Sequence, residues 1–193
     1  MNRLGICLIA LALTGCATAT TVKPGQNALG DRLTVTLDSA WNQIKAPGMG
    51  PAQLWTMEGL PIDQLLIYTG LKNGEPIHAI SSGSNTKSRS FSFRSDMEAD
   101  EIVSLFEGML TRDGSSFKLL KLEPADFGGL KGFHFEYSLI RRVDNVRLSG
   151  MGYGSVSRGG LFALLYQAPQ LTFFPRYRST IEQIALSARI KQT

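Results

Sequence analysis

Apolar and polar residues alternate one by one over several short segments, which is the spacing of half-buried β-strands. The alternation is strict in Leu33–Leu37, and it returns at residues 117–122 and 131–139. Residues 161–167 form an almost unbroken apolar run, which suits a central strand covered on both faces. Turn signals such as Asn73-Gly74 separate these segments. The pattern predicts an antiparallel sheet of about six to eight strands.

Two segments carry apolar residues at helical spacing instead. The sequence Ser95-Asp96-Met97-Glu98 fits a capping box and predicts that the first helix begins after Ser95. Pro175 suits the first position of a second helix, because a proline there loses no hydrogen bond. We expect Arg189 and Lys191 near the C-terminal end of that second helix. The apolar face of the first helix is Ile102, Leu105, Phe106 and Met109, and that of the second is Tyr177, Ile181, Ile184 and Ala188.

This order of elements predicts one α+β domain over residues 32–193, with a mid-chain helix and a C-terminal helix packed on the sheet. Residues 16–31 are small and polar and lack apolar periodicity. We therefore expect them to form a flexible tether in front of the domain.

Residues 1–15 have the parts of a secretory signal peptide. Arg3 supplies a positive charge, an apolar run extends from Leu4 to Leu13, and small residues follow it. The run is shorter than the roughly 20 residues that a membrane-spanning helix needs. An ordinary cleaved signal peptide or a buried helix is the alternative interpretation.

The tetrad Leu13-Thr14-Gly15-Cys16 resembles the lipobox of bacterial lipoproteins. The resemblance implies cleavage in front of Cys16 and attachment of lipid to its sulfur. Ala17 stands where enteric lipoproteins retained in the inner membrane carry aspartate, so the resemblance implies sorting to the outer membrane, facing the periplasm. We thus expect a lipid-anchored protein of the cell envelope. Two or more acyl chains hold a protein on a membrane stably.

Charge and cysteine content narrow the possible functions. The formal net charge is +4, which suits an anionic membrane surface but is far from the footprint of a nucleic-acid-binding protein. Cys7 would leave with the signal peptide and Cys16 would carry lipid, so the mature chain would keep no thiol. Disulfides, cysteine-zinc sites and cysteine nucleophiles are therefore not expected.

The residues of catalytic type do not form a recognisable motif. The chain has two histidines, His78 and His134. Strand alternation places His134 and Glu136 on one face, opposite the aromatic residues of the same segment, and we interpret that face as solvated. No serine lies in a Gly-x-Ser-x-Gly elbow. We predict no metal, no cofactor and no enzymatic activity.

The glycines of Gly150-Met151-Gly152-Tyr153-Gly154 lie in a predicted strand without a following helix. This context favours close packing against a neighbouring strand over a phosphate-binding loop.

Basic residues are the remaining candidates for a binding surface. Arg141, Arg142 and Arg147 cluster at a predicted hairpin tip, and Lys87 and Arg89 lie in a Ser-rich segment that we expect to be exposed. A solvated, charged tip is one interpretation. The other is contact with anionic lipid headgroups or with an acidic protein partner.

Three stretches resemble the Mog1/PsbP-like superfamily: Trp41 with Leu54-Trp55-Thr56-Met57-Glu58-Gly59, then Gly129-Leu130-Lys131-Gly132-Phe133, and finally residues 160–169 with the helix after them. The resemblance spans roughly residues 33–193. It implies an antiparallel sheet with helices packed on its faces, and a role in binding or assembly.

The leading hypothesis is a membrane-anchored, non-enzymatic binding or assembly module of the cell envelope, with an envelope protein as partner. A periplasmic carrier of an apolar ligand is the first alternative, and a large enclosed apolar cavity would favour it. An enzyme of unrecognised type is the second, and a deep pocket holding His78 or His134 beside a carboxylate would favour that one.

Overall fold

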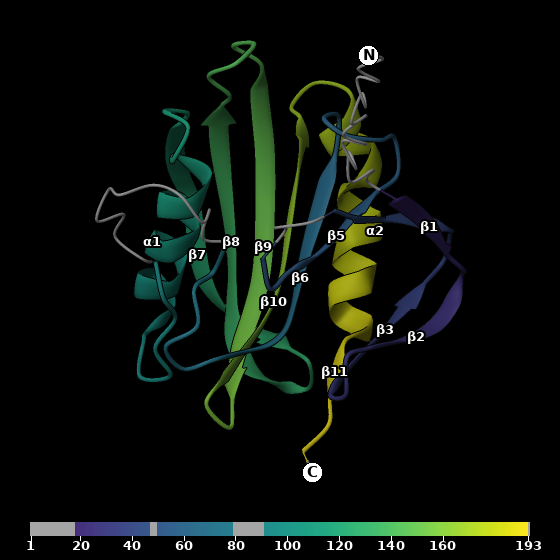
Figure 1. Ribbon diagram of the computed structural model, residues 1–193, viewed down its shortest axis with the longest axis vertical. Coiled ribbons are helices and arrows are strands. Elements are labelled where there is room, and N and C mark those ends of the chain that lie inside the picture. The colour runs from purple at the N-terminus through teal and green to yellow at the C-terminus, as the bar shows by residue number, and fades with distance from the viewer. Residues whose placement is uncertain (1–17, 47–49, 79–90, 193) are drawn as a thin grey trace, which may run out of the picture.

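The computed structural model describes residues 18–46, 50–78 and 91–192 (Figure 1). The signal segment, Cys16, Lys87 and Arg89 lie outside the described residues. Cleavage before Cys16, its lipidation and the role of the two basic residues therefore stay predictions.

Within the described residues, eight strands form one antiparallel sheet in the order β1-β4-β5-β6-β10-β9-β8-β7. This confirms the predicted α+β fold. A smaller sheet has the order β11-β3-β2. The large sheet consists of β1 (Thr18–Val22), β4 (Trp41–Lys45), β5 (Gln53–Thr56), β6 (Gln64–Lys72), β7 (Ser116–Phe127), β8 (Leu130–Ile140), β9 (Arg147–Ser157) and β10 (Gly160–Pro169). The small sheet consists of β2 (Gly25–Leu29), β3 (Leu33–Leu37) and β11 (Arg189–Ile190).

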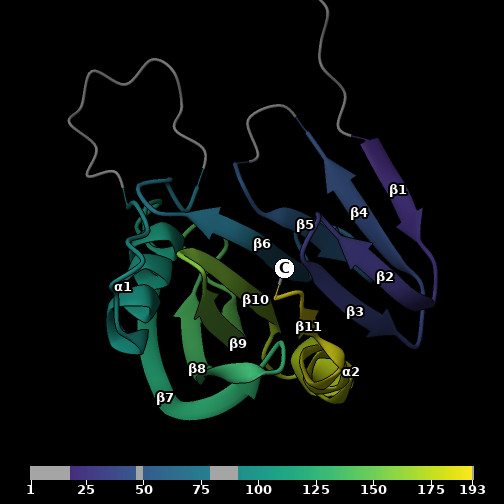
Figure 2. The same cartoon turned by 90° about the horizontal axis from the view of Figure 1, so that it is seen from below.

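The two helices cover opposite faces of the large sheet, and the small sheet lies on the same side as α2 (Figure 2). The helices are α1 (Ala99–Leu110) and α2 (Phe173–Ser187). Strand β10 lies between β6 and β9 and contributes to both cores, since Leu161 and Leu165 pack on the α1 side whereas Phe162 and Tyr166 pack on the α2 side. Burial on both faces explains its unbroken apolar run.

The glycines of β9 leave room for aromatic rings on β8. Gly152 pairs with Phe135, and Gly150 pairs with Tyr137. A Cβ atom on Gly152 would lie 2.3 Å from the Phe135 ring, and one on Gly150 would lie 2.0 Å from the Tyr137 ring. Glycine thus lets each ring lie flat across the neighbouring strand. This confirms the interpretation of the glycines as packing positions.

The predicted tether at residues 16–31 is wrong from Thr18 onward. All five residues of β1 pair with β4, and all five residues of β2 pair with β3. Most side chains of β1 are exposed, so its sequence shows no apolar alternation. Backbone hydrogen bonds to a neighbouring strand form the element instead, and the folded domain includes residues 18–29 as well as the residues from 32 onward.

The first helix begins four residues after Ser95. The backbone N–H of Ser95 donates to Asn73 Oδ1 at 2.9 Å, in the turn after β6, and Glu98 becomes the N-cap. The Glu98 N–H donates to Glu101 Oε2 at 3.0 Å, which is one arm of a capping box three residues beyond the predicted one.

The second helix begins at Phe173, two residues before Pro175. Its predicted buried face is confirmed at Ile181 and Ile184. Arg189 lies near the C-terminal end of this helix, as expected, since it follows the C-cap Ala188 and its Nη1 donates to the Leu186 carbonyl at 2.9 Å. It also pairs with Thr34 of β3 in the small sheet.

Candidate functional site

Three loops of the described chain meet at one end of the large sheet, which we call the loop end (top of Figure 1). They are residues 57–63 between β5 and β6, residues 141–146 between β8 and β9, and residues 170–172 between β10 and α2. The strand order places them side by side, since β5, β6, β10, β9 and β8 are consecutive neighbours.

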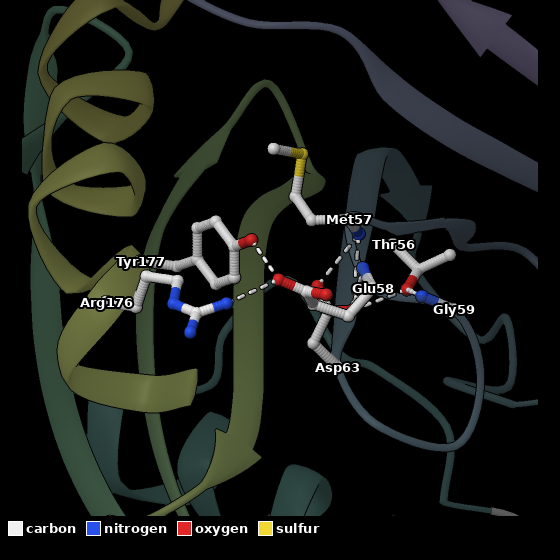
Figure 3. Close-up of polar contacts among 7 residues, drawn as sticks. All are labelled: Thr56, Met57, Glu58, Gly59, Asp63, Arg176 and Tyr177. Atoms are coloured by element: carbon white, nitrogen blue, oxygen red, sulfur yellow. Dashed lines mark hydrogen bonds and ion pairs between the residues drawn. The ribbon is translucent and has the colours of Figure 1, made fainter. Parts of the chain in front are cut away.

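Asp63 fixes the conformation of the first loop. Its carboxylate is fully buried, and it accepts hydrogen bonds from Thr56 Oγ1 at 2.6 Å, from the Met57 N–H at 2.9 Å and from the Glu58 N–H at 2.8 Å (Figure 3). Thr56 Oγ1 in turn accepts from the Gly59 N–H at 2.9 Å. A buried carboxylate needs donors of this kind in place of water. Asp63 is therefore a structural anchor for residues 56–59.

Glu58 connects the same loop to the first turns of α2 (Figure 3). Its Oε1 accepts a short hydrogen bond from the Tyr177 hydroxyl and another from Arg176 Nη1 at 2.9 Å. The Tyr177 bond is the main cause that lowers the pKa of Glu58, and Arg176 lowers it further. Burial and the same bond raise the pKa of Tyr177. Both groups are thus held in the protonation states that keep the loop attached to the helix.

Arg141 connects the first loop to the second. It forms a two-pronged ion pair with Asp144, at 2.9 and 2.6 Å, and its Nη1 donates to the Pro61 carbonyl at 2.7 Å. Only 16% of its side chain is exposed. Two-pronged arginine–carboxylate pairs hold a fixed geometry. Arg141 therefore braces the loop end, and its charge is already matched by Asp144.

The other basic candidates at this tip are more accessible. Arg142 is exposed, although its Nη1 donates to the Asp113 carbonyl at 3.2 Å. Arg147 is exposed and borders a shallow groove of about 530 Å³. The structure thus brings Arg141, Arg142 and Arg147 to one end of the sheet, as predicted, but gives them different roles. The groove is lined by Val146, Arg147, Pro169, Gln170, Leu171 and Thr172.

Large apolar side chains project from all three loops. Leu60 is 42% exposed, Val143 is 83% exposed and Leu171 is 90% exposed. Apolar residues on braced loops, with arginines around them, are typical of a protein-docking surface.

The two histidines lie on opposite sides of the sheet. His134 shares a face with Glu136, opposite the aromatic residues, as predicted, but that face is not solvated. Arg178 of α2 pairs with Glu136 at 2.6 Å across it, and the His134 side chain is only 8% exposed. His134 Nδ1 lies 3.1 Å from Glu123 Oε1, and its ring stacks on Tyr153 with centroids 4.4 Å apart.

His78 packs against Phe91, with ring centroids 6.1 Å apart, on the α1 side. Burial lowers the pKa of His78, and Arg112 adds to the effect. Among the described residues, no group of three or more histidines, cysteines or acids could hold a metal ion. No helix in the described part of the chain has the length and apolar character to cross a membrane.

No protein-family model and no curated protein matches this sequence. Among solved structures, the chain is similar to cyanobacterial PsbP (CyanoP) from Synechocystis sp. PCC 6803, at 16% identity and a TM-score of 0.58 over 97% of this chain and 99% of that one. A weaker similarity is to LpqN, involved in cell envelope biogenesis of Mycobacterium tuberculosis, at 13% identity and a TM-score of 0.37 over 92% and 86% of the two chains. The similarity to CyanoP shows that the chain has a PsbP-like fold, as its sequence motifs suggest.

Sequence reasoning found Arg141 but missed the role of three other residues that organise the loop end, Asp63, Glu58 and Tyr177. Asp63 carried a signal, because it is a lone acid at the start of a strongly apolar segment. Glu58 and Tyr177 carried none, since they are more than a hundred positions apart and only the fold brings them together.

Proposed function

We propose that this protein is a lipid-anchored, non-enzymatic binding module of the cell envelope that presents its loop end to a protein partner. The observation that carries the proposal is the combination of exposed apolar side chains with internal bracing. Leu60, Val143 and Leu171 project into solvent, Asp63 and Arg141 hold the loops of Leu60 and Val143, and the Gln170 N–H donates to the Arg147 carbonyl at 3.1 Å beside Leu171. Loops held in one conformation lose little entropy when they bind.

The proposed location in the cell envelope rests on the sequence. The signal segment and the tetrad Leu13-Thr14-Gly15-Cys16 resemble those of bacterial lipoproteins. The outer membrane is the expected site of anchoring, because Ala17 follows the cysteine.

The packing counts against a carrier of an apolar ligand. Large side chains fill the interface between α2 and the sheet, one of the two places where a helix covers the sheet, and Tyr166 stacks on Phe174 with ring centroids 6.1 Å apart. The fully buried residues there include Trp41, Trp55, Phe162 and Tyr166.

The arrangement of side chains gives an enzyme no more support. His134 does lie beside a carboxylate, that of Glu123, but its ring is covered by Tyr153 and does not line the groove at the loop end. The Asp63 carboxylate accepts hydrogen bonds that fix the backbone of residues 57–58, and the Glu58 carboxylate accepts from Arg176 and Tyr177 of α2, so both have a structural role.

The anchor is tested by intact mass and fractionation of the protein from its native membranes. We expect a chain that begins at Cys16, carries a diacylglyceryl or triacyl mass increment and fractionates with membranes. In the Cys16→Ser variant the increment should be lost. An unmodified soluble chain from the wild-type gene would contradict the anchor and reopen the other interpretations of residues 1–15.

The docking surface is tested by crosslinking in intact cells, comparing wild type with Leu171→Glu. A charge at the most exposed apolar position of the loop end should remove most of the crosslinked partner, because it would have to be desolvated in the interface. Leu186→Glu is the matched control, since Leu186 is 66% exposed on α2. Equal loss of crosslinks in both variants, or in neither, would place the partner elsewhere.

A further inference from the structure

A second concave site lies at the opposite end of the sheet from the loop end. Three segments form it: the turn between β2 and β3, the last residues of β6, and the turn between β9 and β10. The pocket has a volume of about 420 Å³, which is within the range of sites for small ligands. Five residue steps along β6, from Gln64 at the loop end to Thr69 in the pocket wall, separate the two sites by roughly 17 Å. It is therefore independent of the proposed docking surface.

Glycines and a β-bulge open this pocket. The pairing of β10 with β6 shifts register between Leu161 and Phe162, which leaves Gly70 as an extra residue in β6. A Cβ on Gly70, which has a φ of 119°, would lie 3.1 Å from the Phe162 ring. Gly70 and Gly160 approach closely and both line the pocket. Bulges of this kind often re-aim the chain beside binding sites, and bare glycine backbone lets a ligand approach closely.

The charged side chains in the pocket wall are mostly basic. Arg32, Lys72 and Arg158 line it, with Asp31 as the acidic member. The guanidinium of Arg32 is held in place, because its Nη2 donates to Ser157 Oγ at 3.2 Å and it lies 5.0 Å above the Phe162 ring. Cation–π contacts of this kind orient arginine without neutralising it.

Carboxylates lie near two of these groups without pairing with their side chains, since Asp31 adjoins Arg32 in the chain and Glu75 accepts a hydrogen bond from the Lys72 backbone N–H at 2.8 Å. In the part of the chain that the structure describes, neither Arg32 nor Lys72 makes an ion pair, and the partners of Arg32 are a hydroxyl and a backbone carbonyl. By contrast, Arg94, Arg141, Arg176 and Arg178 each pair with a carboxylate. A preorganised cation with only neutral partners retains its capacity for a charged oxygen ligand.

We propose that this pocket binds a phosphate group. Arg32 presents a planar set of donors that matches phosphate oxygens, and Lys72 supplies a mobile point charge on the other wall. The volume leaves space for the organic part of a phosphate monoester beside the charged group. A soluble phosphate ester and a phosphate-bearing lipid headgroup share this chemistry.

The test uses the Cys16→Ser protein, which lacks the proposed anchoring residue, so that lipid on Cys16 does not contribute to membrane binding. Inorganic phosphate is titrated while the amide NMR signals of Gly70, Gly159 and Gly160 are followed. We expect saturable shifts at these residues and about tenfold weaker binding in Lys72→Ala. Lys131→Ala is the matched control, because it removes the same charge from an exposed position outside the pocket and should leave the affinity unchanged.

Two further probes distinguish the sources of the phosphate. Binding to phosphatidic acid vesicles but not to phosphatidylcholine vesicles, weakened by Lys72→Ala, would identify a lipid headgroup. Saturable binding of glycerol phosphate without vesicle binding would identify a soluble ester. Shifts that do not saturate, that chloride reproduces, or that Lys131→Ala changes as much as Lys72→Ala would overturn the proposal. None of these outcomes depends on a partner at the loop end.

Discussion

Replacing Asp63 by alanine is expected to lower the free energy of unfolding by about 3 kcal/mol, or more. The substitution removes a fully buried acceptor and leaves the Thr56 hydroxyl and the Met57 and Glu58 N–H groups without a partner. Each unsatisfied buried donor costs about 1–3 kcal/mol, partly offset where water enters. Urea denaturation followed by circular dichroism measures the change.

Asp126→Ala is the matched control for this substitution. Asp126 is an exposed aspartate near the end of β7, so its removal should change stability by no more than about 0.5 kcal/mol. If Asp63→Ala were as mild as the control, water could replace the carboxylate, and Asp63 would not be the anchor of the loop end. Asp63→Ala should also weaken capture of a partner, because the loop that carries Leu60 would lose its fixed conformation.

Gly152→Ala is expected to destabilise the protein by about 1–3 kcal/mol. The new methyl group would lie 2.3 Å from the Phe135 ring, which is fully buried and stacked on Phe106 with centroids 5.8 Å apart. In a strand without such a neighbour the same change would stabilise, since alanine has less conformational entropy to lose than glycine. A loss of stability in Gly152→Ala would therefore show that the new methyl group collides with the Phe135 ring.

A double-mutant cycle isolates that contact. Phe135→Leu alone should destabilise by leaving a gap, but in its presence Gly152→Ala should cost less, with a coupling energy of about 1–2 kcal/mol. Thermal unfolding of the four proteins gives the cycle. Additive effects would mean that the ring moves aside for the methyl group and that glycine is not required there.

The elements that sequence predicted well are those whose side chains face a core. The alternation in Leu33–Leu37 and the apolar run at residues 161–167 both report burial, and both segments are strands in the structure. Strand β1 shows the limit of this reasoning, since its side chains are mostly exposed. Its existence depends on pairing with β4, and the side-chain pattern carries no trace of such backbone contacts.

The sequence correctly predicted a capping box for the first helix but placed its N-cap three residues too early. Both Ser95 and Glu98 can cap a helix, and the choice depends on Asn73, whose side chain accepts a hydrogen bond from the Ser95 N–H although it lies 22 residues earlier in the chain.

The cluster of Arg141, Arg142 and Arg147 was also visible in the sequence. The pairing of Arg141 with Asp144 and with the Pro61 carbonyl depends on how loops from distant strands meet. The sequence could therefore place the three arginines at one end of the sheet but could not show which of them forms an ion pair within the protein.

The position of β10 in the sheet has a consequence for how this chain folds. Strands β1, β4, β5 and β6 lie on one side of it and β9, β8 and β7 on the other, so β10 alone joins the two halves through hydrogen bonds. It also follows α1 and all of those strands in the chain. The pairing of β6 with β10 closes a long loop of intervening chain. The chain loses conformational entropy in this step before the contacts between the two strands stabilise it. The large sheet can therefore be completed only after residues up to the end of β10 are available, and chain that emerges earlier carries strand edges that must be kept from pairing with other chains.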